Sequence, residues 1–196
     1  LISSMNSAEA GAIALDGDGN VYVTGQTQGS FEGCPTIGGR DFFVVKYNSA
    51  GTRQWVQQLG GNSDERAYGI TVSPGGDVYV TGSTTGVIDG QTFKSDTDIF
   101  IMKIDTSGVY KWTRLLGSES PGGEEEGRGI CADAAGNVYV TGYTRGKLGL
   151  ALLRDRDAFV AKYDSGGAHQ WTKQFSSENV QGMEGQGIVC AGSRVI

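Results

Sequence analysis

The chain has 196 residues, with 33 glycines and 3 prolines, and its 22 acidic and 16 basic residues give a net charge of −6. The net negative charge argues against a nucleic-acid-binding surface, and the apolar runs are too short to cross a membrane. Short segments rich in Val, Ile, Thr, Tyr and Phe alternate with glycine-rich breaks, which indicates an all-β protein.

Four strand-length segments recur in the same order along the chain. The first segment occupies residues 12–15, 69–72, 129–132 and 187–190, and the second is Val-Tyr-Val-Thr-Gly, which begins at Val21, Val78 and Val138. The third begins at Asp41, Asp98 and Asp157, and the fourth contains Trp55, Trp112 and Trp171. Each segment is rich in β-branched or aromatic residues, so we expect every period to contain four strands.

The link between the first two segments of the first period, Asp16 to Asn20, has oxygen-bearing side chains spaced like the start of a calcium loop. An EF-hand loop needs glycine at its sixth position and glutamate at its twelfth, where this chain has Val21 and Thr27. The later periods keep the glycine but not the carboxylate pattern, since Asp16 becomes Ser73 and Asp18 becomes Gly75 in the second period. We therefore predict a tight hairpin turn here and no metal site.

Four short strands per repeat, in a unit that returns whole, are typical of a β-propeller blade. We predict an all-β β-propeller segment, a single partial ring over residues 1–196 with about three four-stranded antiparallel blades. The blades are expected at about 12–59, 69–116 and 129–175, with partial blade strands at 1–2 and 187–196. Because three blades do not close a ring, we expect other protein subunits or further blades of a longer chain to be the partners.

These motifs resemble the bacterial SBBP-type β-propeller repeat, in three copies that cover nearly the whole chain. The resemblance rests on the GIxV-like first segment, the Gly-Asn turn, VYVTG, DxFVxKY and the trailing Trp. It implies a secreted or cell-surface protein, and therefore an extracellular or cell-surface location, but no common activity. The Gly-x-x-x-Trp spacing, as in Gly51 to Trp55, is also similar to the docking motif of quinone-dependent propeller dehydrogenases. In those enzymes the Trp packs between blades, so we expect all three Trp residues to be buried between blades.

Two sets of repeated residues are expected to be structural. Asp41, Asp98 and Asp157 return once per blade, which favours bonds to nearby backbone amides over three copies of an active site. Cys34, Cys131 and Cys190 are odd in number and have no metal-binding spacing, so we expect buried apolar side chains or free thiols.

Binding groups are expected in the loops between the second and third strands, at residues 26–40, 83–97 and 143–156. Each loop contains a pair of apolar residues, Phe31 with Ile37, Ile88 with Phe93, and Leu148 with Leu152 or Leu153, which we interpret as loop anchors rather than as a docking patch. The third loop adds an apolar residue and four basic ones. These candidate binding residues are Arg145, Lys147, Leu150, Arg154 and Arg156.

A second candidate group precedes the first strands and would gather at one mouth of the central channel. Its members are Glu9, Arg66, Glu126 and Glu184. The carboxylates could meet a cation or a basic ligand, but solvated loop charge is the interpretation that we favour.

We predict a non-enzymatic scaffold that mediates protein–protein or ligand interactions through variable rim loops, with no cofactor and no catalytic residues. The alternative is part of a propeller enzyme, or a cation-binding protein that uses the acidic groups near the channel mouth. A hydrolytic triad has no support, because His169 is the only histidine and no GxSxG motif is present.

Overall fold

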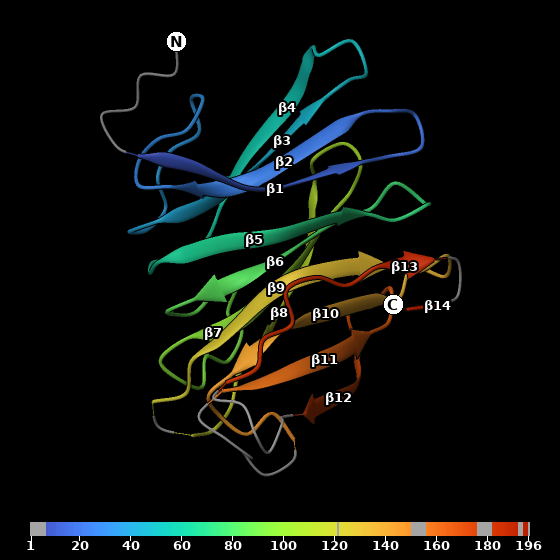
Figure 1. The fold of residues 1–196 in the computed structure, drawn as a ribbon. Helices are drawn as coiled ribbons and strands as arrows, with labels where there is room; N and C mark the ends of the chain where they lie inside the picture. The colour runs from blue at the N-terminus through green and yellow to red at the C-terminus, as the bar shows by residue number, and fades with distance from the viewer. Residues whose placement is uncertain (1–6, 121, 150–155, 176–181, 192–193, 196) are drawn as a thin grey trace.

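The computed structural model of the protein describes residues 7–120, 122–149, 156–175, 182–191 and 194–195. These residues form three four-stranded antiparallel sheets that lie one beside the next, and no helix occurs among them (Figure 1). Within each sheet the strands follow chain order, as in a propeller blade. The predictions of fold class and of about three blades are confirmed.

Each blade contains four strands of seven or eight residues. The first blade comprises β1 (Ala8–Leu15), β2 (Val21–Thr27), β3 (Asp41–Tyr47) and β4 (Arg53–Leu59). The second comprises β5 (Glu65–Val72), β6 (Val78–Thr84), β7 (Asp98–Ile104) and β8 (Tyr110–Leu116). The third comprises β9 (Glu125–Ala132), β10 (Val138–Thr144), β11 (Asp157–Tyr163) and β12 (His169–Phe175).

The first strands begin four residues before the predicted positions, at Ala8, Glu65 and Glu125 rather than at residues 12, 69 and 129. A short hairpin of β13 (Cys190–Ala191) and β14 (Arg194–Val195) lies within the predicted partial blade at 187–196. The predicted fragment at residues 1–2 lies outside the described residues. The additional residues at the strand starts are polar in two blades, so the apolar pattern alone did not include them.

The Val-Tyr-Val-Thr-Gly segment recurs because its Tyr, Thr and Gly positions each have a separate structural task. The Thr24 hydroxyl donates to the Phe43 carbonyl at 2.8 Å, and Thr81 and Thr141 repeat this bond in their own blades. A Cβ at Gly25 would lie 2.0 Å from the Glu9 carbonyl oxygen, so only glycine fits beside the bulge in the first strand. The Tyr22 ring contacts Trp55 edge-on at 6.0 Å between centroids, a pair also repeated in the later blades.

The blades pack through apolar faces. Phe42 of the first blade stacks on Phe100 of the second at 4.7 Å between ring centroids, within a buried cluster that also contains Val44, Val78 and Val80. A second cluster joins the second and third blades through Ile99, Ile101, Val138, Val140 and Phe159. The two central strands of the middle blade, β6 and β7, are therefore covered on both faces, and β6 is buried along its whole length.

A tryptophan from one blade docks on a hairpin turn of the next. A Cβ at Gly108 would lie 3.0 Å from the Trp55 ring, and one at Gly167 would lie 2.9 Å from the Trp112 ring. Trp55 Nε1 also donates to the Thr106 carbonyl of the same turn at 3.1 Å. The two glycines have φ values of 85° and 82°, so they provide both the turn geometry and the space for the indole.

The prediction that all three tryptophans are buried between blades is wrong for Trp171. Trp55 and Trp112 lie half-buried between blades, whereas Trp171 is 37% exposed. The reason is its position in the last complete blade, where no following Gly-containing turn contacts it among the described residues.

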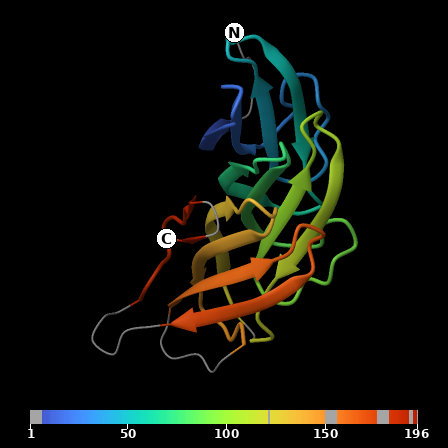
Figure 2. The same cartoon turned by 90° about the vertical axis from the view of Figure 1, so that its right-hand side faces the viewer.

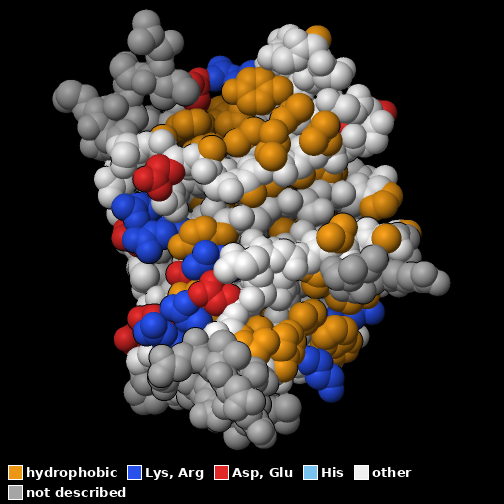
Figure 3. All heavy atoms as spheres, viewed as in Figure 1, with side chains coloured by type: hydrophobic (Ala, Val, Ile, Leu, Met, Phe, Trp, Pro, Cys, Tyr) orange, Lys and Arg blue, Asp and Glu red, His pale blue; other side chains and the backbone are white. Residues whose placement is uncertain are grey.

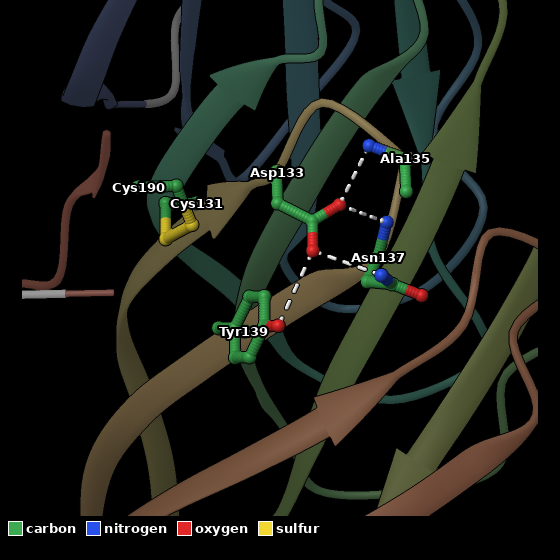
Figure 4. Close-up of a disulfide and its surroundings, with 6 residues drawn as sticks. All are labelled: Cys131, Asp133, Ala135, Asn137, Tyr139 and Cys190. Carbon is green, nitrogen blue, oxygen red and sulfur yellow. Dashed lines mark hydrogen bonds between the residues drawn. A yellow bond between two sulfur atoms is a disulfide. The ribbon is translucent and has the colours of Figure 1, made fainter. Parts of the chain in front are cut away.

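The DGDGN segment is a hairpin turn closed by an aspartate, as predicted. One Asp16 carboxylate oxygen accepts from the backbone amides of Asp18 and Asn20 at 3.0 and 2.9 Å, and the other accepts from the Asn20 side chain and the Tyr22 hydroxyl. Asp133 makes the same bonds in the third blade (Figure 4). These bonds lower the pKa of both carboxyl groups, although partial burial opposes them.

The expectation that all three cysteines are free is wrong. Cys131 of β9 and Cys190 of β13 form a disulfide (Figure 4), whereas Cys34 is a free thiol. The cysteines lie 59 residues apart in neighbouring positions of two successive first segments. They meet because the chain before β13 passes close to β9, where a Cβ at Gly129 would lie 2.8 Å from the Gly187 Cα, although their sequence spacing fits no known motif.

The docking contacts predict different costs for truncating different tryptophans. Trp112→Ala should lower the free energy of unfolding by about 3 kcal/mol, because it removes an indole packed between two blades. Trp171→Ala should cost less than about 1 kcal/mol, because its ring lacks the second blade. Urea unfolding of both variants measures this difference, and equal losses would contradict the docking role.

Candidate interaction surface on the variable rim

The loops between second and third strands meet the connections between blades at one rim of the molecule, which we call the variable rim. Gly39 donates its amide to the Ser63 carbonyl at 3.1 Å, and Glu65 donates to the Arg40 carbonyl at 2.7 Å. Thr97, Gly123 and Glu125 repeat this arrangement between the second and third blades. Each loop is thus fixed to the start of the following blade, while the short hairpin turns lie at the opposite rim.

Two fully buried glutamates support this rim. Glu65 accepts from the Gly61 amide at 2.7 Å and from the Thr84 hydroxyl at 2.9 Å. Glu125, its counterpart one blade later, accepts from the Ser95 hydroxyl, the Ser118 amide and the Thr144 hydroxyl. Burial raises the pKa of both carboxyl groups. The sequence marked both residues only as part of the acidic loops and did not predict their burial, because the first blade has Ala8 at this position and no repeat signal distinguished it.

The repeated aspartates are structural, as predicted. Asp41 accepts from the amides of Ile37 and Gly38 and from the Gln58 side chain, all within its own blade. Asp98 accepts from Lys94 and Ser95 in the same way. The Ser95 hydroxyl lies 2.7 Å from Asp98 and 2.6 Å from Glu125, so it joins the carboxyl groups of consecutive blades.

The first apolar residue of each rim loop is an anchor, as expected. Phe31, Ile88 and Leu148 are all buried. The expectation is wrong for Ile37, which is 45% exposed because the amide of this residue, rather than its side chain, is held by Asp41. Leu152 and Leu153 lie outside the described residues.

The predicted channel-mouth residues do not form one cluster. Glu9 is exposed and accepts from the Gln26 side chain, and Arg66 is exposed. Glu126 forms an ion pair with Arg128 at 2.7 Å, and Glu184 forms one with Arg156. The structure thus places two of the carboxylates against guanidinium groups.

The two ion pairs, Glu126 with Arg128 and Glu184 with Arg156, form a charged group together with nearby tyrosines. This group lies where Lys, Arg, Asp and Glu side chains gather over the starts of β5 and β9 (Figure 3). Arg128 lies over the rings of Tyr68 and Tyr143 at 5.1 and 5.6 Å, and Arg156 lies over Tyr143 at 4.2 Å. Burial and the neighbouring Glu126 raise the pKa of Tyr143 to about 12. Sequence analysis missed Arg128, Tyr68 and Tyr143, whose equivalents in other blades are chemically different.

The basic rim loop separates into paired and exposed residues. Arg145 forms an ion pair with Glu124 at 3.1 Å, and Arg156 belongs to the charged group described above. Lys147 is exposed at the rim. Leu150 and Arg154 lie outside the described residues.

A cleft of about 480 Å³ opens on the variable rim between the second and third blades. Lys94, Lys147 and Glu119 line it together with Leu116 and Leu148. Lys94 lies 3.4 Å from Glu119, a long contact between two exposed groups. We call this hollow the rim cleft.

The rim cleft exists because one inter-blade connection is longer than the other. Between β8 and β9 the connection has eight residues (117–124), whereas between β4 and β5 it has five (60–64). At the shorter connection a Cβ on Gly61 would lie 2.2 Å from the Val87 carbonyl oxygen, and one on Gly38 would lie 2.4 Å from that of Gly61. Glycine packing therefore closes the equivalent space between the first and second blades.

Comparisons with known proteins give one family and two curated relatives. The family model described as SBBP, beta-propeller repeat, matches residues 6–32, 54–89 and 111–149. The regulatory protein FlaEY of Caulobacter vibrioides is 26% identical over the whole of this chain, which spans 22% of its length. An uncharacterized WD repeat-containing protein, L264, of Acanthamoeba polyphaga mimivirus is 26% identical over 55% of this chain and 9% of its own length.

A solved structure of a protein of unknown function from Bacteroides caccae aligns with 94% of this chain and 49% of its own, at 9% identity and a TM-score of 0.45. In the part of the chain that the structure describes, no helix is long and apolar enough to span a bilayer.

The buried glutamates predict a pH dependence of stability. Their folded-state pKa is raised, so the native state binds more protons than the unfolded state from about pH 4.5 up to that raised pKa, and stability falls as the pH rises through this window. Glu125→Gln cannot ionise and should flatten this fall. Urea unfolding of both proteins at about pH 5 and about pH 7.5 measures this loss of unfolding free energy. An equal loss in the variant and in the unsubstituted protein would contradict the raised pKa of Glu125.

Proposed function

Because the chain belongs to the SBBP β-propeller repeat family, we propose that this propeller scaffold is non-enzymatic and binds a protein partner at its variable rim. The observation that carries the proposal is the rim cleft, which lies at the longer of the two described inter-blade connections. Loops fixed on a rigid framework are a common location for binding groups.

The geometry of the rim favours recognition of a partner. The cleft combines an apolar floor from Leu116 and Leu148 with the exposed ammonium groups of Lys94 and Lys147. Such a surface can take an apolar side chain flanked by carboxylates, and interface energy concentrates in contacts of this kind. The rest of the chain is net negative, so a partner with acidic groups would be oriented toward this rim.

We propose an extracellular or cell-surface location as well. The Cys131–Cys190 disulfide supports it, because disulfides persist in oxidising compartments and are rare in the cytosol. FlaEY carries the name of a regulatory protein, and this chain corresponds to about a fifth of it, so its role is compatible with a binding module within a larger protein.

Affinity capture from an extract of the source organism tests the proposed function. The protein should retain a defined set of proteins, and Lys94→Glu with Lys147→Glu should lose that set because the cleft changes charge. The matched control is Lys111→Glu with Lys173→Glu, two exposed lysines that do not line the cleft. Equal retention by the two double variants would contradict binding at the rim cleft.

A further inference from the structure

The rim cleft continues along the fourth strands at the seam between the second and third blades. A second hollow of about 300 Å³ opens there, and it shares Leu116 and Leu148 with the rim cleft. Arg114, Tyr163 and His169 line this second hollow as well. The strands of the two blades are the yellow-green and orange arrows in Figure 2. We call the two hollows together the seam groove.

In each of the first two blades a carboxylate of the rim loop is bonded to the start of the fourth strand. In the first blade Glu32 forms an ion pair with Arg53, the first residue of β4. In the second blade Asp89 accepts from the hydroxyl of Tyr110, the first residue of β8. The same bond between loop and strand is thus made twice with different partners for the carboxylate.

The third blade lacks this carboxylate. Gly149 takes the place of Asp89, and His169 takes the place of Tyr110. Tyr110 packs against the apolar cluster between the first two blades, whereas His169 is exposed. Gly149 lines the rim cleft and His169 lines the second hollow, so the seam groove is open where the internal bond would form.

A cation lies at this seam without an acidic partner. Arg114 of β8 donates to the carbonyls of Thr113 and Gly167 at 2.6 and 2.8 Å, and its Nη2 makes a long contact of 3.4 Å with the Gly166 carbonyl. These carbonyls hold the guanidinium in place but use only part of its N–H donors. Among the described residues no carboxylate pairs with Arg114, and the uncharged Gln57 is its counterpart at the seam between the first two blades.

His169 has a ring nitrogen that can donate to a carboxylate. Its Nε2 lies 2.8 Å from the Thr172 hydroxyl, and when that hydroxyl donates, the proton of the neutral ring is on Nδ1. Burial lowers the pKa of His169, so the ring is neutral at about pH 7. The imidazole therefore provides one N–H beside the charge of Arg114.

We propose that the seam groove binds a carboxylate of the protein partner between the Arg114 guanidinium and the His169 imidazole. The partner presents an extended segment, whose apolar side chain lies on Leu116 and Leu148 and whose adjacent Asp or Glu takes the role that Asp89 has in the second blade. This inference rests on the proposed function, because it names a further contact of the same partner.

The charges of the seam groove favour such a segment. Its described lining includes three cations and one acid, namely Arg114, Lys94, Lys147 and Glu119. In a protein with a net charge of −6, this local excess of positive charge attracts acidic segments and disfavours basic ones. A guanidinium can bind a carboxylate through two N–H groups, so the contact also fixes the register of the segment along the groove.

Selection from a phage library of random peptides tests this inference with a defined probe. Peptides of about twelve residues are long enough to cross the seam groove in extended form, at about 3.3 Å per residue. The peptides that the full chain retains should share an apolar residue next to Asp or Glu. Fluorescence anisotropy of one selected peptide, synthesised with a dye, then measures its dissociation constant for the protein and its variants.

Two changes alter the carboxylate site in different ways. Arg114→Gln removes the cation and should weaken peptide binding about tenfold or more. Gly149→Asp supplies an internal carboxylate, so it should bind the peptide about tenfold or more weakly than Gly149→Asn. Asn has the same shape and shares any strain that the φ of 153° imposes, but it has no charge.

Lys111→Gln is the matched control for Arg114→Gln. Lys111 is an exposed cation of the same strand, paired with Asp105 and outside the seam groove, so its loss should leave peptide affinity within about twofold. Urea unfolding checks that each variant is folded, and the comparison at Gly149 tests the site even if Arg114→Gln is unstable.

The inference is overturned if no peptide is retained, if the retained peptides lack Asp and Glu, or if they bind Gly149→Asp and Gly149→Asn equally. Peptides that respond to Lys94→Glu with Lys147→Glu but not to Gly149→Asp would overturn the carboxylate site alone and leave binding at the rim cleft standing. Peptides that respond to Gly149→Asp as expected, together with failed capture of partner proteins, would instead support the site and contradict the proposed function.

Discussion

The packing of one blade's tryptophan on the next blade's glycine turn is the contact on which the rest of the structure depends. A blade is a sheet with two apolar faces and cannot cover either of them alone. Trp55 on Gly108 and Trp112 on Gly167 fix the position of each blade relative to its neighbour at the hairpin-turn rim. The aromatic and aliphatic face residues then pack in register, as the stacking of Phe42 on Phe100 illustrates.

The variable rim is held by a different chemistry. Buried carboxylates, Asp98 and Glu125 around the Ser95 hydroxyl, tie consecutive blades together where the loops begin. Because these groups use their oxygens internally, the loops beyond them are free to differ in length and charge. This division explains why a lengthened connection creates the rim cleft without disturbing the sheets below it.

The fold could be predicted from the sequence because repetition made each strand visible three times. The Val-Tyr-Val-Thr-Gly segment, the Gly-x-x-x-Trp spacing and the turn at Asp16 all have the roles that their residue types indicated. What could not be predicted depended on which blade has a neighbour. Trp171 has the same sequence context as Trp55 and is nevertheless exposed, and Cys131 of β9 meets Cys190 of the short strand β13 although these two strands belong to different sheets.

The candidate site was less accessible to prediction for the same physical reason. Lys147 lines the rim cleft as part of the basic loop that the sequence marked. Lys94 lies in the second predicted binding loop, residues 83–97, but was not singled out, and Glu119 lies in the connection between β8 and β9, which had no repeat signal. The carboxylates of Glu126 and Glu184 were noticed as charges, and their arginine and tyrosine partners were not. Side chains that differ between blades carry the specific chemistry, and repetition cannot reveal them.

Native-state hydrogen exchange measures most directly whether blade-on-blade packing governs this structure. The account predicts that amides of β6 and β7, which have a blade on each side, exchange most slowly, and that Trp112→Ala speeds exchange in β7 and β11 more than in β3. Equal protection in all three blades, with an equal response to Trp112→Ala throughout, would contradict it.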